Sequence, residues 1–201
     1  MPTPPPITSI DQLDPQATYS YADYLTWRFT EWVELIKGKF QRPMAGAGQF
    51  HQIVSGNLLS TIRPYLKGKP CRVLAAPFDV RLPTGGANGD AQILTVVQPD
   101  LFVVCDRAKL DERGCVGPPD WIIEIVSPGN TARDTRVKFE LYQESGVTEY
   151  WLVFPGLKTV AAYVLHGDRY ELAVEVAEPG RVPIYTLPEL VLEWADIFAD
   201  D

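Results

Sequence analysis

Two carboxylates lie within or beside segments that otherwise consist of apolar residues. Asp100 comes directly before the run 101–104, Leu-Phe-Val-Val, and Glu124 lies inside 121–126, Trp-Ile-Ile-Glu-Ile-Val. Burying an isolated, ionised carboxylate costs several kcal/mol unless it is paired, protonated or bound to a metal. Two such residues in neighbouring apolar runs therefore indicate a metal site or an acid–base site.

The order of the chain brings these two carboxylates together. We predict that 101–105 and 121–126 are strands that pair in antiparallel orientation, joined by the polar connection 106–119. In such a pair the start of the first strand faces the end of the second, so Asp100 lies near Glu124. Neighbouring carboxylates repel unless they share a proton or bind a cation. Their oxygens suit Mg²⁺ or Mn²⁺, and the backbone carbonyl of Ile125 is a further candidate ligand.

A lysine follows on the next predicted helix, 131–145. Asp134 and Lys138 are four residues apart and therefore share a face of that helix. If the helix packs across the sheet, Lys138 reaches Glu124, where it could orient a water or stabilise charge on a phosphate. Simpler interpretations remain open. Asp100 also fits a turn cap after Pro99, Glu124 fits a core ion pair with Lys138, and Asp134 with Lys138 fits an ordinary solvated pair.

The remaining pattern predicts an α/β (α+β) fold with the sheet at its centre. Ser20 is a candidate cap for a short helix, and Gly38 fits the turn of a hairpin. The predicted elements are a helix at 21–25, a hairpin at 31–40, a helix at 50–66, strands at 71–82, 93–97, 149–154, 160–165 and 170–176, and a short helix at 191–198.

Composition limits the classes of function. The net charge of −8 argues against a protein that holds nucleic acid on a broad basic surface. It does not exclude an enzyme that reaches a phosphodiester through a metal ion. No apolar run approaches the roughly 18–20 residues that span a bilayer, so no membrane association is expected.

Length and cysteine content suggest one domain in a reducing compartment. We expect a flexible, Pro-rich leader over residues 1–18 and a single domain over 19–201. Cys71, Cys105 and Cys115 lack the paired spacing of zinc sites. We predict reduced, buried thiols and hence a cytoplasmic protein.

At these residues the chain resembles the Uma-two family of restriction-endonuclease-like proteins, within the PD-(D/E)xK nuclease superfamily. The resemblance runs from about residue 20 to 198. The matching pieces are 97–100 (VQPD), 119–128 (PDWIIEIVSP), Arg133-Asp134 with Lys138, Tyr142, 146–153 (GVTEYWLV), the hairpin 34–39, and His51 with Asn57. The resemblance implies a restriction-endonuclease-like core, a central mixed sheet flanked by helices with an N-terminal hairpin. It also implies that Asp100 and Glu124 are metal ligands. The usual pattern places lysine two residues after the glutamate, where this chain has Val126, so Lys138 is the natural substitute.

Three further residues are accessory candidates for the site. Glu34 lies in the predicted hairpin and equally fits a surface charge. His51, at the start of a predicted helix, also fits a structural or capping residue. Asp79 could be an accessory ligand, although pairing with Arg81 on the same strand face is the competing interpretation.

Two functions follow from this pattern. The first is a Mg²⁺- or Mn²⁺-dependent DNA endonuclease that uses Asp100, Glu124 and Lys138. The second is a catalytically inactive nuclease-fold protein that acts through protein partners, which the acidic charge and Val126 favour. A homodimer is also a candidate state, because aromatic residues such as Trp151 and Tyr163 offer interface material.

Overall fold

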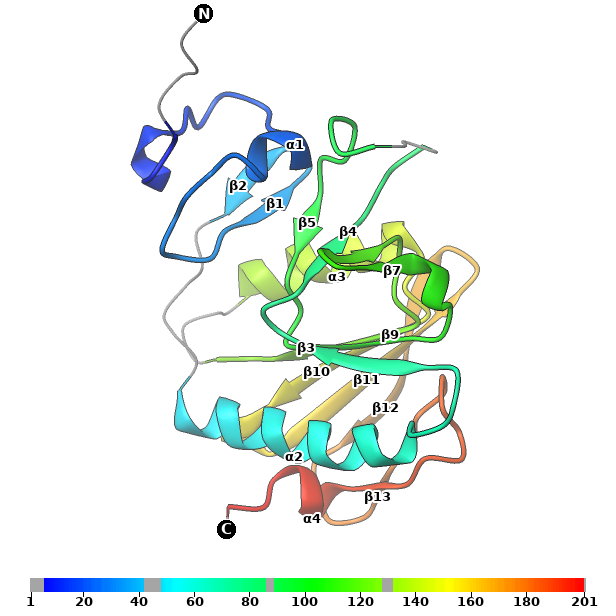
Figure 1. The fold of residues 1–201 in the computed structure, drawn as a ribbon. Helices are drawn as coiled ribbons and strands as arrows, with labels where there is room; N and C mark the ends of the chain where they lie inside the picture. Colours follow the sequence, from blue (N-terminus) through cyan, green and yellow to red (C-terminus); the bar gives the residue numbers. More distant parts are fainter. Residues whose placement is uncertain (1–5, 42–47, 86–88, 128–131, 201) are drawn as a thin grey trace, which may run out of the picture.

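Two six-stranded mixed sheets, a small two-stranded sheet and four α-helices make up the described part of the protein (Figure 1). The computed structural model describes residues 6–41, 48–85, 89–127 and 132–200, except for the side chains of 132–134. Its first half contains η1 (Ile10–Gln12), α1 (Tyr21–Tyr24), β1 (Glu34–Ile36), β2 (Lys39–Gln41), α2 (Gln49–Tyr65), β3 (Arg72–Ala75), β4 (Asp79–Arg81), β5 (Val96–Val97), β6 (Leu101–Val104) and η2 (Arg107–Lys109). Its second half contains β7 (Leu110–Asp111), β8 (Gly114–Val116), β9 (Trp121–Ile125), α3 (Ala132–Ser145), β10 (Glu149–Phe154), η3 (Pro155–Leu157), β11 (Thr159–His166), β12 (Arg169–Val176), β13 (Arg181–Val182), β14 (Leu192–Glu193) and α4 (Trp194–Ile197).

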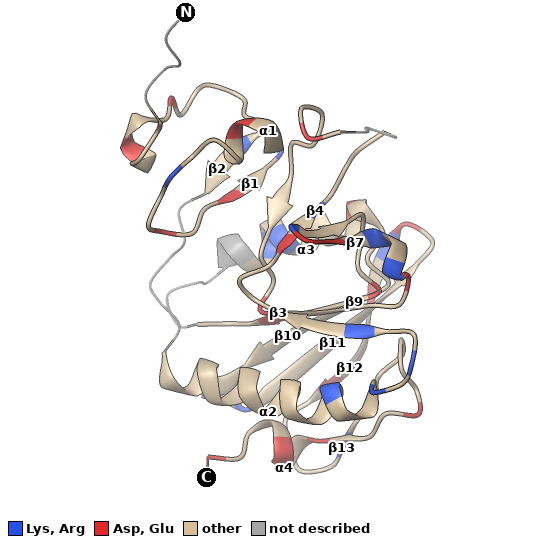
Figure 2. Cartoon of the chain, viewed as in Figure 1, with Lys and Arg blue, Asp and Glu red and all other residues tan. Residues whose placement is uncertain are grey.

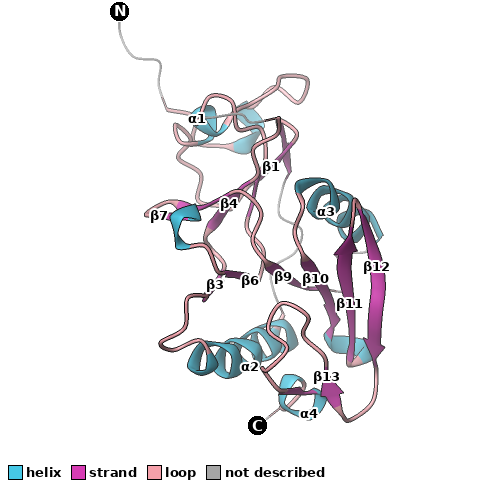
Figure 3. Ribbon diagram, turned by 90° about the vertical axis from the view of Figure 1, so that its right-hand side faces the viewer, coloured by secondary structure: helices cyan, strands magenta, loops and turns pink. Residues whose placement is uncertain are grey.

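The central sheet lies between two layers of helices (Figures 1 and 3). Its strand order is β12-β11-β10-β9-β6-β3, with β9 and β10 parallel and the other neighbours antiparallel. One face, with Trp121, Ile123 and Trp151, packs under α2 and α4. The other face, with Phe102 and Ile122, packs against α3. Side chains alternate between faces along a strand, so consecutive apolar residues fill both layers.

The second sheet is assembled from short segments in the order β2-β1-β5-β4-β8-β7. It joins the central sheet through the chain itself, because β5 leads into β6 after only three residues and β4 follows β3 in the same way. A third core, which includes Tyr21, Trp27 and Leu35, lies beneath the β1–β2 hairpin. The hairpin therefore packs on a core of its own through Leu35.

Most predicted elements are confirmed, and the differences have local causes. The predicted helix at 50–66 is α2, and the hairpin turns at Lys37 and Gly38, whose φ values of +51° and +77° suit a two-residue turn. The predicted strand 71–82 divides into β3 and β4 on either side of Pro77, which has no N–H for a strand ladder. The predicted connection 106–119 contains β7 and β8, which belong to a second six-stranded sheet where the sequence predicted a single central one. Asn130, the predicted N-cap of α3, lies outside the described residues.

The N-terminal segment differs from the flexible leader that its proline content predicted. Residues 1–5 lie outside the described part of the chain, but Ile10 and Leu13 are buried in the third core. Ser9 caps η1, with its side chain accepting from the Asp11 amide. Apolar residues within a Pro-rich segment thus anchor it to the hairpin.

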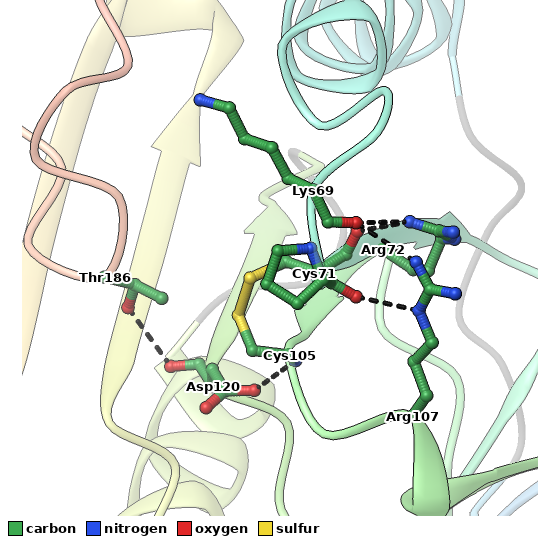
Figure 4. Close-up of a disulfide and its surroundings, with 8 residues drawn as sticks. Lys69, Cys71, Arg72, Cys105, Arg107, Asp120 and Thr186 are labelled. Carbon is green, nitrogen blue, oxygen red and sulfur yellow. Dashed lines mark hydrogen bonds between the residues drawn. A yellow bond between two sulfur atoms is a disulfide. The ribbon is translucent and has the colours of Figure 1, made fainter.

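The prediction for the cysteines is wrong for two of the three. Cys71 and Cys105 form a disulfide (Figure 4), whereas Cys115 is a buried free thiol as expected. The β3–β6 register pairs Arg72 with Val104, so the next position outward places Cys71 opposite Cys105. The cysteine content therefore no longer supports a reducing compartment. Among the described residues, no helix is long and apolar enough to cross a membrane.

Candidate active site

Two neighbouring strands place Asp100 and Glu124 side by side. The β6–β9 register pairs Leu101 with Ile123, and its continuation by one position sets Asp100 opposite Glu124. The Ile125 amide donates a hydrogen bond to Asp100 Oδ2 at 2.7 Å, which holds the aspartate against the end of β9. Directly opposed residues of an antiparallel pair share one face of the sheet, and this is the face that α3 covers.

Helix α3 supplies two donors to the same glutamate oxygen. Lys138 Nζ lies 3.0 Å from Glu124 Oε1, and the Tyr142 hydroxyl donates to that oxygen at 2.6 Å. The two donors are four residues apart, so they share one face of the helix. The lysine reaches the glutamate across the sheet, as its position on the helix predicted.

The hairpin adds a third carboxylate. Glu34 Oε1 lies 3.1 Å from Lys138 Nζ and accepts a hydrogen bond from the Gln98 amide at 2.9 Å. Pairing of β1 with β5 brings Glu34 to the segment that leads into Asp100. The structure therefore places Glu34 in the site, where the competing interpretation was a surface charge.

The first turn of α2 brings His51 to the other carboxylate. His51 Nε2 lies 3.1 Å from Asp100 Oδ1, and Nδ1 is buried without a partner among the described residues. Burial lowers the pKa of this imidazole, but the hydrogen bond to Asp100 and the charges of Asp100 and Glu124 outweigh it and raise the pKa overall. A histidine held this way restrains Asp100 and adds positive charge when protonated.

Asp79 lies next to this group rather than within it. It accepts hydrogen bonds from the Gln98 side-chain amide at 2.8 Å and from the Tyr21 hydroxyl at 3.0 Å. Its predicted competing partner, Arg81, binds Asp111 at 2.6 Å instead, because the β7–β8 hairpin brings that aspartate to the end of β4. Among the described residues, Gln98 is what links Asp79 to the site, through its side chain to Asp79 and its backbone amide to Glu34.

Negative charge is in excess at the site. Burial is the main cause that raises the pKa of Glu124 to about 7; the neighbouring Asp100 and Glu34 add to the rise, while Lys138 opposes it. Burial alone would lower the pKa of Lys138, yet the charges of Glu124 and Glu34 hold it above its usual range. The ammonium is thus kept charged among three carboxylates. A further cation would relieve the remaining repulsion.

The donor chemistry fits a hard divalent ion. In the described part of the chain no three His, Cys, Asp or Glu side chains are already gathered as a ligand set. Mg²⁺, however, commonly binds proteins through one or two carboxylates and keeps several waters. Asp100 and Glu124, with the Ile125 carbonyl, supply oxygens of that kind.

Sequence reasoning missed two residues of this arrangement. Tyr142 was noticed only as part of the family resemblance, and Gln98 only as a neighbour of Asp100. The signal for Tyr142 is its spacing of four residues from Lys138 on one helix face. Gln98 contacts Glu34 through its backbone amide, and the residue type at position 98 gives no signal of a backbone contact.

Comparison with known proteins agrees with this fold. A crystal structure described as a putative nuclease belonging to DUF820, from Anabaena variabilis, superposes with a TM-score of 0.68 at 23% identity and covers 90% of this chain and 97% of that one. The uncharacterized protein slr1290 of Synechocystis is 25% identical over 136 residues, which is 65% of this chain and 65% of that relative. The family model Uma2, described as "Putative restriction endonuclease", matches residues 21–195. The chain therefore belongs to the Uma2 family.

Proposed function

We propose that the chain is a Mg²⁺- or Mn²⁺-dependent nuclease that hydrolyses phosphodiester bonds in DNA. The observation that carries this proposal is the opposition of Asp100 and Glu124 across β6 and β9, with Lys138 at 3.0 Å from Glu124. Membership of a family whose description reads "Putative restriction endonuclease" supports the same reaction.

Each side chain has a role in this proposal. A bound divalent ion would polarise the scissile phosphate and lower the pKa of an attacking water. Asp100, Glu124 and the Ile125 carbonyl would hold that ion. Lys138 would orient the water or stabilise negative charge that develops on the phosphate. His51 restrains Asp100 through the 3.1 Å contact.

Supporting contacts keep these groups in position. The Tyr142 hydroxyl donates to Glu124 Oε1 at 2.6 Å and so helps to fix the orientation of the carboxylate. Glu34 takes the second contact of the Lys138 ammonium and so fixes its direction. Partners of this kind orient metal ligands, and their loss typically lowers metal affinity or activity about 10- to 100-fold.

A non-catalytic role is the second candidate. Lys138 is already engaged by Glu34 and Glu124, which is also what a purely structural ion-pair group requires. The net charge of −8 likewise favours a protein partner over DNA. In that case the nuclease scaffold would act through protein contacts.

Cleavage of supercoiled and single-stranded DNA with Mn²⁺ or Mg²⁺ separates the two candidates. We expect cleavage by the wild type and loss of it in Glu124→Ala and Lys138→Ala. Glu144→Ala is the matched control, because this glutamate of α3 forms an exposed ion pair with Lys37. Mn²⁺ should also raise the melting temperature of the wild type but not of Asp100→Ala. Absence of cleavage and of any Mn²⁺ shift would favour the non-catalytic role.

A further inference from the structure

Two exposed aromatic rings lie beside the carboxylate site. Trp32 is 56% exposed and Phe50 is 59% exposed, and no other aromatic side chain among the described residues is more than half exposed. Trp32 precedes Glu34 by two residues, and Phe50 directly precedes His51. Exposing rings of this size has a hydrophobic cost, so two of them next to one site suggest a ligand that covers them.

Trp32 lies on the same side of the hairpin strand as Glu34. Burial alternates along this segment: Val33 and Leu35 are buried in the third core, whereas Trp32 and Glu34 are not. Alternation with a period of two places residues i and i+2 on one face of an extended chain. The indole therefore borders the site from the hairpin side.

Phe50 borders the site from the opposite side, on the first turn of α2. In Figure 1 the hairpin and this end of α2 lie above and below the central sheet, on the same side of the molecule. Phe50, Ile53, Pro155 and Phe198 line a cavity of about 180 Å³. Pro155 directly follows β10, whose Leu152 pairs with Glu124, so the cavity opens at the end of the sheet that carries the site.

Basic side chains near these rings are few, and most of them are engaged. Lys158 also lines the Phe50 cavity, with its ammonium 5.8 Å from the centre of the Trp194 ring. Lys37 pairs with Glu144 at 2.7 Å, and Lys39 Nζ donates to the carbonyls of residues 16 and 17, each at 2.7 Å. Apart from His51, helix α2 carries one charged side chain, Arg63, at its far end (Figure 2). Duplex DNA is held mainly by contacts of Lys and Arg with phosphates. Unpaired bases, in contrast, stack on aromatic side chains whatever their sequence.

We propose that Trp32 and Phe50 are stacking platforms for unpaired bases on the two sides of the site, so that the substrate is single-stranded DNA. This inference rests on the proposed nuclease function and narrows its substrate. A strand that crosses between the rings presents its backbone to Asp100 and Glu124. The Phe50 cavity receives one base, while Trp32 stacks on another.

Binding measured without cleavage tests this substrate class. Fluorescence anisotropy in EDTA would follow a labelled oligothymidylate of roughly 16 nucleotides, the upper end of single-strand site sizes, and a duplex of the same length. Trp32→Ala and Phe50→Ala should each weaken single-strand binding about 5- to 150-fold. Trp32→Phe should retain most of the affinity. Tyr185→Ala is the control, because this 47% exposed residue contacts Glu149 at the start of β10, whereas the site lies near the other end of that strand, so its loss should leave affinity unchanged.

The outcomes separate this inference from the proposed function. Equal affinity of Trp32→Ala, Phe50→Ala and the wild type, or a wild-type preference for duplex, would overturn it even if DNA is cleaved. Selective loss of single-strand binding would support it even if no cleavage is seen, and the nuclease proposal alone would then fail. A change in native mass of either alanine variant in sedimentation would show that the rings bind a second copy of the chain, which also overturns it.

Discussion

Replacing Lys138 with methionine should destabilise the protein far more than an exposed lysine replacement does. The Lys138 side chain is 17% exposed, and its partners Glu34 and Glu124 are 22% and 13% exposed, with contacts of 3.1 and 3.0 Å. Removing one partner of a buried ion pair costs about 3–5 kcal/mol, because the other charge stays uncompensated. Some water reaches this site, so we expect the lower end, about 3 kcal/mol.

Methionine is the informative substitution because it keeps the apolar stem of the side chain. Lys138→Ala would also lose about 2 kcal/mol from the methylenes beyond Cβ, at about 0.8 kcal/mol each. For a domain of this size, a loss of about 3 kcal/mol lowers the melting temperature by roughly 6–12 °C. Urea unfolding in EDTA, followed by tryptophan fluorescence and circular dichroism, measures the change in free energy.

Lys37→Met is the matched control. Its ion pair with Glu144 has a similar length, 2.7 Å, but the two side chains are 62% and 54% exposed. Exposed pairs contribute less than about 1 kcal/mol. Equal losses in Lys138→Met and Lys37→Met would refute the view that Lys138 is the counter-ion of a buried carboxylate group. Added Mn²⁺ should recover part of the stability lost in Lys138→Met, since the carboxylates then lack their own cation.

Three other substitutions probe separate contacts. Tyr142→Phe removes the 2.6 Å hydrogen bond to Glu124 and should weaken Mn²⁺ binding about 10- to 100-fold by isothermal titration calorimetry, with the fold retained. Glu149→Ala leaves three donors unpaired, the Trp151 indole N–H and the backbone amides of residues 185 and 186, and should cost about 3–5 kcal/mol in urea unfolding. Asp111→Asn should cost about 1–2 kcal/mol at pH 7, a range reduced for the exposure of this carboxylate. The hydrogen bond from Arg81 is the main cause that lowers the pKa of Asp111. Its contribution is therefore present above the unfolded value of 3.8 and is lost as the pH falls through the lower folded value, so the wild-type and variant stabilities should converge in acid.

Antiparallel geometry explains why the centre of the site could be predicted from sequence. Two apolar runs that follow one another along the chain can pair in antiparallel orientation, and Asp100, which precedes the first run, then lies opposite Glu124 inside the second. Asp100 and Glu124 follow from this constraint alone. The α3 helix had to cover an apolar face, which brought Lys138 to Glu124. Both predictions needed only the pairing of consecutive strands and the spacing of residues on one helix.

The contribution of Glu34 depended on a contact that no local pattern encodes. The hairpin reaches the site because Leu35 pairs with Val96, and the sequence shows only that both segments prefer strands. The same limit applies to Cys71 and Cys105. A cysteine in an apolar run has the same sequence pattern whether its thiol is free or in a disulfide. Only the β3–β6 register shows that Cys71 and Cys105 lie opposite each other.

The position of the lysine shows which feature of the site has to be preserved. Val126 stands where the superfamily pattern has lysine, and here it packs with the apolar core beneath α3. The ammonium instead arrives from that helix, at 3.0 Å from Glu124 and 3.1 Å from Glu34. The proposed reaction would require a cation beside the glutamate, since the Coulomb energy depends on distance and surroundings rather than on position along the chain. Glu34, the third carboxylate, contacts the Lys138 ammonium and so restrains the long, flexible side chain that reaches over from α3. Glu34 and Lys138 are thus best understood as one unit: loss of Glu34 would leave Lys138 with Glu124 alone, and loss of Lys138 would leave both glutamates without their cation.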